Sequence, residues 1–149
     1  MLEIYTIGFT QKTAEQFFKI LEKAQIQCLI DVRLNNVSQL AGFTKSTDLK
    51  FFLKKILNAQ YCHSISFAPT KDILDQYKKN KISWSAYEER YLNLLKERKI
   101  ENIFEKMLPK EISKVCLLCS EATPDKCHRR LLAEYLKAKL NIEVKIIHL

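Results

Sequence analysis

Glycine and proline are scarce in this chain, which contains two glycines and three prolines among its 149 residues. Such a composition excludes collagen-like and low-complexity segments. Neither the GxGxxG fingerprint of dinucleotide-binding domains nor the GxxxxGK[ST] phosphate loop is present, so a Rossmann cofactor site and a P-loop are poorly supported. Gly8 follows the first apolar segment, where it indicates a tight turn, a positive φ or a close approach of another backbone segment.

Long hydrophobic runs and export signals are also missing. No stretch approaches the ~20 apolar residues that cross a bilayer. The N-terminal segment Met1–Tyr5 has neither the basic nor the long apolar region of a signal peptide. The five cysteines are odd in number, and their spacings do not resemble a secreted disulfide framework. We therefore expect a cytoplasmic protein with reduced thiols and no membrane association.

Positive charge is in excess, with a formal net charge of +8 and lysine preferred over arginine. A basic surface favours anionic partners such as nucleotides or nucleic acid. Lysine recurs on nearly every expected helix and forms no tract, so a solubilising lysine coat is the simpler interpretation. The length and the 47% hydrophobic content fit one domain, residues 1–149, with a real core.

Short apolar runs alternate with amphipathic stretches, a pattern typical of α/β proteins. Strands are expected at Ile4–Ile7, Cys28–Arg33, Gln60–Ser64, Val115–Cys119 and Val144–Ile147. Helices are expected after the capping box Thr13–Gln16, from a Thr47 cap to about Leu57, and at Lys71–Lys79. Three more are expected at Ala86–Arg98, which follows a capping box at Ser85–Glu88, at Ile100–Met107 and at His128–Leu140. Asn35–Gly42 is expected to be a loop.

Strands separated by helices predict a single-domain α/β fold, a mostly parallel sheet flanked by helices in a Rossmann-like layered architecture. Ligands of such sheets bind beyond the carboxyl ends of the strands. This rule brings three distant segments to one edge: Gly8–Thr10, Asp31–Arg33 and the loop after Cys119.

The most distinctive chemistry lies between Cys116 and Arg130. Cys116 and Cys119 have the spacing of a metal-binding pair, but residues three apart on a strand point to opposite faces. Cys119, Cys127 and His128 are therefore the better metal-ligand set, because they follow the strand and begin the next helix.

A reactive thiol is the main competing interpretation. Cys119 precedes a helix N-terminus and two arginines, which lower a thiol pKa and can also hold a phosphate or carboxylate. Glu121 can act as a general acid or base. A third interpretation is purely structural, with Cys116 in the core, Cys127 beneath the helix and the arginines exposed or ion-paired. The sequence leaves all three open.

Two further groups carry alternatives. Asp31 can orient a catalytic group and Arg33 can clamp an anion, or the two can form an internal ion pair that ties down the edge of the sheet. Trp84, Tyr87 and Tyr91 share a helical neighbourhood, where they can stack on a base but are more often core residues.

Together these residues resemble the domain-of-unknown-function 488 family over essentially the whole chain. The resemblance is carried by Thr6-Ile7-Gly8, by Asp31-Val32-Arg33, by Trp84 with Tyr91, and by Leu118-Cys119-x-Glu121-Ala122-x-Pro124-x-x-Cys127-His128-Arg129. It implies a compact α/β fold with a Cys/Glu/Cys-His-Arg centre and no established activity. The family pattern highlights Gly8, Asp31, Arg33, Cys119, Glu121, Cys127, His128 and Arg129.

Two positions depart from that family. Phe9 stands where a polar His or Tyr is common, and Phe67-Ala68-Pro69 stands where a Leu-Gly-Gly-like turn is common. A weaker likeness, at the level of analogy, is to rhodanese domains through Leu29–Arg33 and a cysteine loop before a helix.

Our leading hypothesis is an enzyme-like domain that binds a small anionic ligand, with phosphate as the expected group. Cys119 is the nucleophile or redox thiol, Glu121 transfers or orients a proton, and His128 activates the thiol. Gly8, Asp31, Arg33 and Arg129 bind the ligand, and Cys127 and Pro124 support the site. The alternatives are a non-enzymatic nucleic-acid-binding module that uses the lysine-rich surface, and a metal centre of Cys119, Cys127 and His128. The cofactor and the oligomeric state are left unknown.

Overall fold

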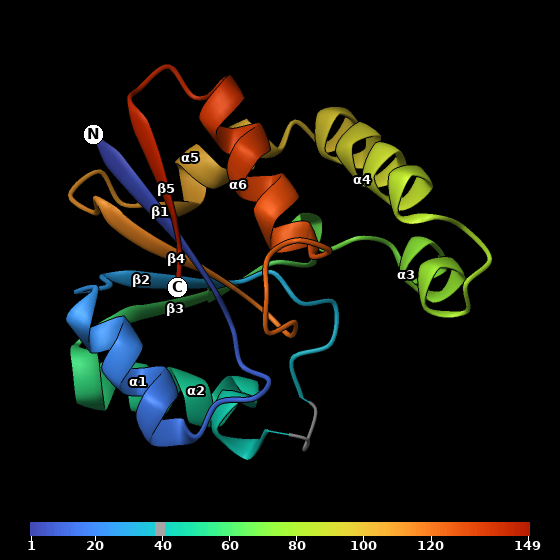
Figure 1. The fold of residues 1–149 in the computed structure, drawn as a ribbon. Coiled ribbons are helices and arrows are strands. Elements are labelled where there is room, and N and C mark those ends of the chain that lie inside the picture. The colour runs from blue at the N-terminus through green and yellow to red at the C-terminus, as the bar shows by residue number, and fades with distance from the viewer. Residues whose placement is uncertain (38–40) are drawn as a thin grey trace.

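Five apolar segments form one parallel sheet in the structure, a computed structural model that describes residues 1–37 and 41–149. Apolar runs of this kind suit strands that are covered on both faces. The strands are β1 (Leu2–Gly8), β2 (Cys28–Asp31), β3 (Gln60–His63), β4 (Lys114–Cys119) and β5 (Val144–His148). Their order across the sheet is β3-β2-β4-β1-β5, and every pairing is parallel (Figure 1).

Six α-helices accompany the sheet, as expected for an α/β protein. They are α1 (Ala14–Lys23), α2 (Ser46–Phe52), α3 (Lys71–Lys78), α4 (Trp84–Arg98), α5 (Ile100–Met107) and α6 (His128–Lys139). The predicted fold class, a parallel sheet flanked by helices in a Rossmann-like arrangement, is confirmed. None of the helices in residues 1–37 and 41–149 has the length and apolar character needed to cross a membrane.

The sheet separates two hydrophobic cores because successive strand residues point to opposite faces. Ile4 and Leu117 lie in the core beneath α4, α5 and α6, whereas Tyr5 and Leu118 lie in the core beneath α1 and α2. Figure 1 shows these helices on the two sides of the sheet. Both faces are thus buried, which explains why the strands read as nearly continuous apolar runs.

Helix starts agree with the sequence only in part. The capping box at Thr13 is present, with reciprocal hydrogen bonds between Thr13 and Gln16. The capping box predicted at Ser85 is wrong, because Ser83 is the N-cap and accepts a hydrogen bond from the Ala86 amide. Both serines are compatible with an N-cap, and the structure selects the earlier one, which brings Trp84 into the helix.

The segment after β2 also differs from expectation. Lys45, rather than Thr47, precedes α2, and the helix continues as a π-helical turn at Leu53–Leu57. Of the predicted loop at Asn35–Gly42, residues 35–37 and 41 are outside helices and strands, and residues 38–40 lie outside the described part of the chain. Gly42 does not belong to the loop, because it begins a 3-10 helix at Gly42–Thr44.

Candidate functional site

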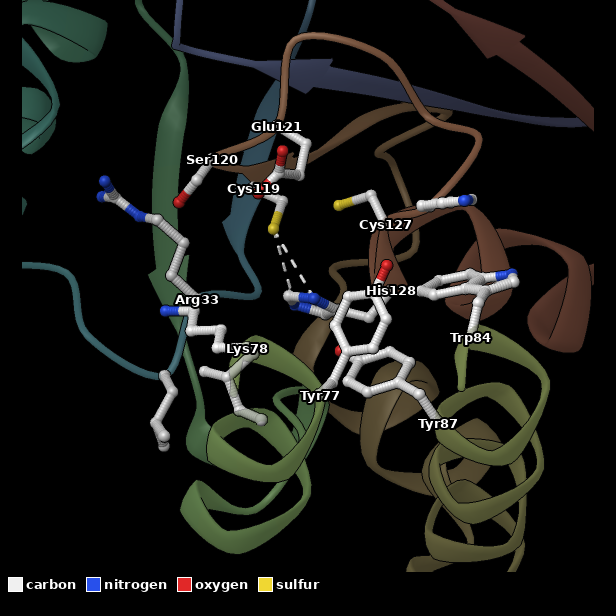
Figure 2. A pocket seen from close by; sticks show the side chains of 13 residues that line it. Arg33, Tyr77, Lys78, Trp84, Tyr87, Cys119, Ser120, Glu121, Cys127 and His128 are labelled. Carbon is white, nitrogen blue, oxygen red and sulfur yellow. Dashed lines mark hydrogen bonds between the residues drawn. The ribbon is translucent and has the colours of Figure 1, made fainter. Parts of the chain in front are cut away.

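The carboxyl ends of β1, β2 and β4 meet at one edge of the sheet, as the sequence predicts for a parallel arrangement. Gly8 is paired in register with Cys119, and the Val32 amide donates to the Leu118 carbonyl at 3.1 Å. Helix α6 begins at His128, and eight residues separate it from the end of β4 at Cys119. Segments far apart in the sequence therefore build one pocket, with Cys119, Cys127 and His128 among its lining residues (Figure 2).

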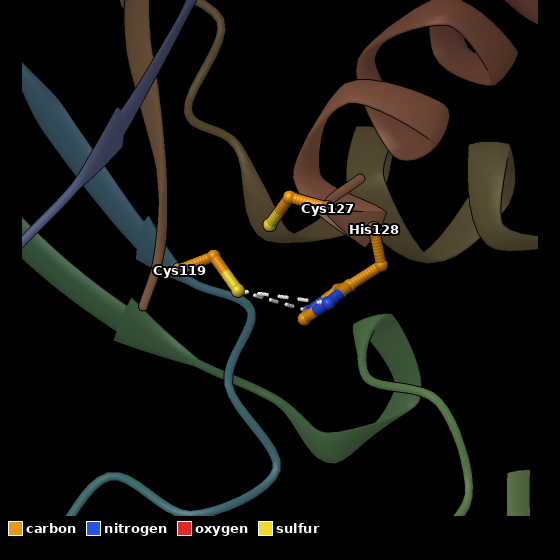
Figure 3. A group of neighbouring side chains, drawn as sticks. All are labelled: Cys119, Cys127 and His128. Carbon is orange, nitrogen blue, oxygen red and sulfur yellow. Dashed lines mark hydrogen bonds between the residues drawn. The ribbon is translucent and has the colours of Figure 1, made fainter. Parts of the chain in front are cut away.

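Cys119, Cys127 and His128 form a buried cluster at the base of this pocket (Figure 3). Cys119 ends β4 and Cys127 is the N-cap residue of α6, so the strand end and the helix start fix their separation. One ligand atom from each residue lies within 4.8 Å of the others. Cys116 packs in the opposite core, beneath α1 and α2, which confirms that a single metal could not use both Cys116 and Cys119.

The orientation of the His128 ring is set by the backbone of β2. Its Nε2 lies 2.7 Å from the Val32 carbonyl oxygen, and because that oxygen can only accept, Nε2 is the donor. In the neutral ring Nδ1 then carries the lone pair. The Cys119 sulfur lies 3.6 Å from Nδ1 and 3.7 Å from Nε2. Such nearly equal distances place the sulfur against the ring and in line with neither nitrogen.

Arg129 is a fully buried cation beside this cluster. Its Nη1 donates to the Glu121 carbonyl at 2.6 Å, while Nε and Nη2 have no hydrogen-bond partner. It forms no salt bridge with any carboxylate of the described residues. A buried charge without a counter-ion is costly, so a nearby negative group is expected. The Arg129 charge acts to lower the pKa of Cys119 and Cys127.

The pKa values of the two thiols of the cluster are shifted in opposite directions. The hydrogen bond from Cys119 lowers the pKa of Cys127 well below its ordinary value, and the charges of His128 and Arg129 act in the same direction against burial. The same interaction with Cys127, together with burial, raises the pKa of Cys119. Cys127 also precedes the first turn of α6, where helix amides favour negative charge. Within the pair, Cys127 is therefore the thiol whose surroundings favour the thiolate form.

Gly8 allows the loop after β4 to approach β1. A Cβ atom at this position would lie 1.6 Å from the Glu121 carbonyl oxygen, and the φ of Gly8 is not positive. Of the alternatives the sequence left open, close approach is the one observed. Thr10 holds the same loop, because its amide and hydroxyl donate to the Ser120 carbonyl at 3.2 and 2.8 Å. The Pro124 carbonyl accepts from the Cys127 amide at 3.2 Å and leads the loop into α6.

Asp31 and Arg33 form a buried, bidentate ion pair. Arg33 Nε and Nη2 each donate to an Asp31 carboxylate oxygen at 2.8 Å. Nη1 and Nη2 also donate to Thr44, and Tyr61 donates to Asp31 at 2.7 Å. Four of the roughly five N–H donors of a guanidinium group are thus engaged within the protein. This geometry matches the interpretation in which the pair ties down the edge of the sheet.

The pocket has a volume of about 130 Å³ and includes residues that the sequence did not single out as a site. Leu74, Tyr77 and Lys78 of α3 line it, as do Leu34, Ser120 and Lys126. Ile73, Leu74 and Tyr77 give α3 an apolar face at helical spacing, but such a pattern does not distinguish a pocket wall from a core-facing surface. Trp84 and Tyr87 also line the pocket, although core packing was the favoured interpretation for them.

Comparison with known proteins gives a family but no activity. The family model described as "Domain of unknown function DUF488" matches residues 13–136, a span that contains every predicted site residue except Gly8. No match was found among the curated proteins or among the solved structures.

Proposed function

This chain belongs to the family described as Domain of unknown function DUF488, which assigns it no activity, and we propose that it is a small thiol-dependent enzyme domain that binds an anionic ligand. The expected anion is a phosphate group. The observation that carries the proposal is the pairing of a buried arginine that lacks a carboxylate partner with two thiols at the end of β4 and the start of α6.

Charge balance supports a thiolate in this place. Burying the Arg129 guanidinium without a counter-ion would cost several kcal/mol, and a thiolate in the adjacent cluster removes much of that cost. Cys119 and Cys127 share one proton in this proposal, and Cys127 is the nucleophile, with Cys119 as its hydrogen-bond donor. The sequence-based hypothesis placed the nucleophile at Cys119. We now prefer Cys127 because it combines a lowered pKa with a helix N-terminus.

The other predicted site residues receive supporting roles. Arg129 stabilises the thiolate and holds the loop through the Glu121 carbonyl. Glu121 itself is exposed and lines the pocket, so its carboxylate is available to exchange a proton with a bound ligand. His128 packs against the Cys119 sulfur. The Asp31–Arg33 pair positions the edge of the sheet, and the remaining Arg33 donor contributes to anion binding.

The test is the rate at which Cys127 reacts with iodoacetamide, measured over a range of pH and mapped by mass spectrometry of the peptides. We expect Arg129→Met to move the pH midpoint of this reaction upward, because the Arg129 charge acts to lower the pKa of Cys127. The background should carry Cys62→Ser, since a hydrogen bond from Cys28 lowers the pKa of Cys62 to about 7 and makes it a competing thiol.

Arg130→Met is the matched control. Arg130 is the next residue, is partly exposed and pairs with Glu134 one turn along α6, so its loss should change neither the rate nor the stability appreciably. Arg129→Lys keeps a positive charge and should show a smaller shift of the midpoint, which guards against misfolding of Arg129→Met. The same pH midpoint for Cys127 in wild type and a folded Arg129→Met protein would refute the proposal.

A metal centre is the second candidate, favoured by the convergence of Cys119, Cys127 and His128 within 4.8 Å. Two thiolates and an imidazole leave a fourth position open, as in catalytic zinc sites. The hydrogen bond from His128 Nε2 to the Val32 carbonyl is the kind that orients a ligand histidine. We rank this candidate second because the Cys119 sulfur lies against the ring and is not aligned with Nδ1.

Elemental analysis of untagged protein separates the two candidates. The thiol proposal expects far less than one equivalent of zinc or iron in the wild type. Near-stoichiometric metal that disappears in Cys127→Ser and persists in Cys116→Ser would establish the metal centre instead, because Cys116 faces the opposite core.

A further inference from the structure

Aromatic rings form one wall of the pocket above the thiol cluster. Trp84 stacks on Tyr87 with ring centroids 5.1 Å apart and planes at 22°, and Tyr77 packs on both at 5.6 and 5.0 Å. Figure 2 shows these side chains coming from α3 and α4, across the pocket from Ser120 and Glu121. Tyr77 and Trp84 are only half-buried, so the exposed parts of their rings are accessible to a flat ligand.

Tyr91 shows what a purely structural aromatic looks like in the same helix. It is fully buried, its hydroxyl donates to the Phe67 carbonyl at 2.6 Å, and it does not line the pocket. Its ring packs edge-on against His128 at 5.5 Å. Tyr91 therefore serves the core, while Tyr77 and Trp84 present their rings to the pocket.

Positive charge surrounds the aromatic wall. Lys78 and Lys126 are exposed lining residues, and Arg33, which follows the end of β2, lines the pocket with one N–H donor left over. Glu121 is the one carboxylate among the lining residues of this pocket. The balance favours an anionic group at the mouth, near the lysines.

The size of the pocket limits what lies inside it. A volume of about 130 Å³ suits one flat heterocyclic ring and is well below the roughly 300–1,000 Å³ of pockets that enclose a whole drug-sized ligand. A sugar and a phosphate attached to such a ring would extend to the mouth, where Lys78 and Lys126 are exposed.

We propose that this pocket binds a mononucleotide, with its base packed against Trp84 and Tyr77, stacked on one ring and edge-on to the other, and its phosphate held by Lys78 and Lys126. Stacking on aromatic side chains tolerates any base because every base has a π-face. The inference rests on the proposed function, since it names the ligand of the same site, and it brings the ligand next to Cys127.

The test uses the fluorescence of Trp84, the sole tryptophan of the chain. Uridine 5′-monophosphate, uridine and ribose 5-phosphate are titrated separately, and calorimetry provides a second measurement. We expect saturable quenching by the nucleotide and binding at least about tenfold weaker for both fragments, because each fragment lacks one of the two recognition elements.

Variants assign the two elements to residues. Tyr77→Ala should weaken nucleotide binding by about tenfold or more, whereas Tyr77→Phe, which keeps the ring, should bind within about twofold of wild type. Lys78→Ala should weaken binding and reduce its salt dependence. Lys79→Ala is the matched control, because Lys79 is the neighbouring exposed lysine and does not line the pocket.

Three results would overturn the inference. They are equal affinity for ribose 5-phosphate and the nucleotide, binding unaffected by a folded Tyr77→Ala protein, or at least tenfold tighter binding of a single-stranded oligonucleotide, which would identify a strand as the ligand. Binding requires no thiol chemistry. A nucleotide that binds while Cys127 is unreactive would therefore refute the thiol mechanism alone, and a reactive Cys127 without nucleotide binding would refute the ligand alone.

Discussion

At the scale of single residues, the two buried arginines of the site have opposite surroundings. Arg33 is neutralised by Asp31 through two hydrogen bonds, whereas Arg129 has two nitrogens without a partner. The sequence predicted the same role for both, ligand binding. It could not distinguish them, because whether a guanidinium meets a carboxylate two residues away depends on rotamers and on the turn of the chain.

Of the two glycines, Gly8 has the less room for a side chain. We expect Gly8→Ala to lower the free energy of unfolding by on the order of 1–3 kcal/mol, since the new methyl group would overlap the Glu121 carbonyl and force the loop away. The displaced loop should also slow iodoacetamide labelling of Cys127. Urea unfolding and peptide mapping measure the two effects.

Gly42→Ala is the control for that substitution. A Cβ at Gly42 meets no atom within 4 Å and its φ is not positive, so the change should be neutral or stabilising by up to about 1 kcal/mol. Equal stability of the two variants would contradict the close approach of the loop to β1.

The positions of site residues could be predicted where they depend on the end of one element and the start of the next. The cluster of Cys119, Cys127 and His128 follows from a strand end and a helix start, both visible in the sequence. The contributions of Tyr77 and Lys78 were not predictable, because they depend on where α3 lies against α4 and the pocket, which is a matter of tertiary packing.

At the scale of elements, all five strands and six helices were predictable from periodicity, and the errors fall at their ends. Two serines competed for the start of α4, and local spacing could not choose between them. The order of the strands could not be predicted either, because an apolar run indicates that a strand is buried but not which strands lie beside it.

The competition at α4 gives a sharp test. We expect Ser83→Ala to destabilise the protein by about 1 kcal/mol, because the Ala86 amide loses its acceptor. Ser85 lies inside the helix at an exposed position, so Ser85→Ala should change the free energy of unfolding by less than about 0.5 kcal/mol. Thermal unfolding of both variants measures these effects, and a larger loss of stability in Ser85→Ala would contradict Ser83 as the N-cap of α4.

At the scale of the whole molecule, lysine is dispersed. Exposed lysines occur on every helix of the described chain: Lys19, Lys50, Lys71, Lys96, Lys106 and Lys137 are examples, one on each from α1 to α6. Lysines spread over every helix contribute to a diffuse positive potential.

A nucleic-acid-binding module remains a prediction with a distinct signature. We expect retention on immobilised DNA or RNA at low salt only, with affinity falling by a factor on the order of 10³ or more between 50 and 200 mM salt if several phosphates are contacted. Cys119→Ser should bind identically. Retention that survives high salt, or that is lost in Cys119→Ser, would contradict a purely electrostatic surface.

The position of β1 in the sheet has a consequence for biosynthesis. The N-terminal strand lies between β4 and β5, and these partners become available only when residues 114–119 and then residues 144–148 have left the ribosome. Pairing of strands so far apart in the sequence is slow, because the entropy cost of closing the loop comes before the contacts that stabilise it. The backbone N–H and C=O groups of β1 therefore stay unpaired by their final partners during most of translation. The thiol pocket needs Gly8 beside Cys119, so it is among the last parts of the protein to form.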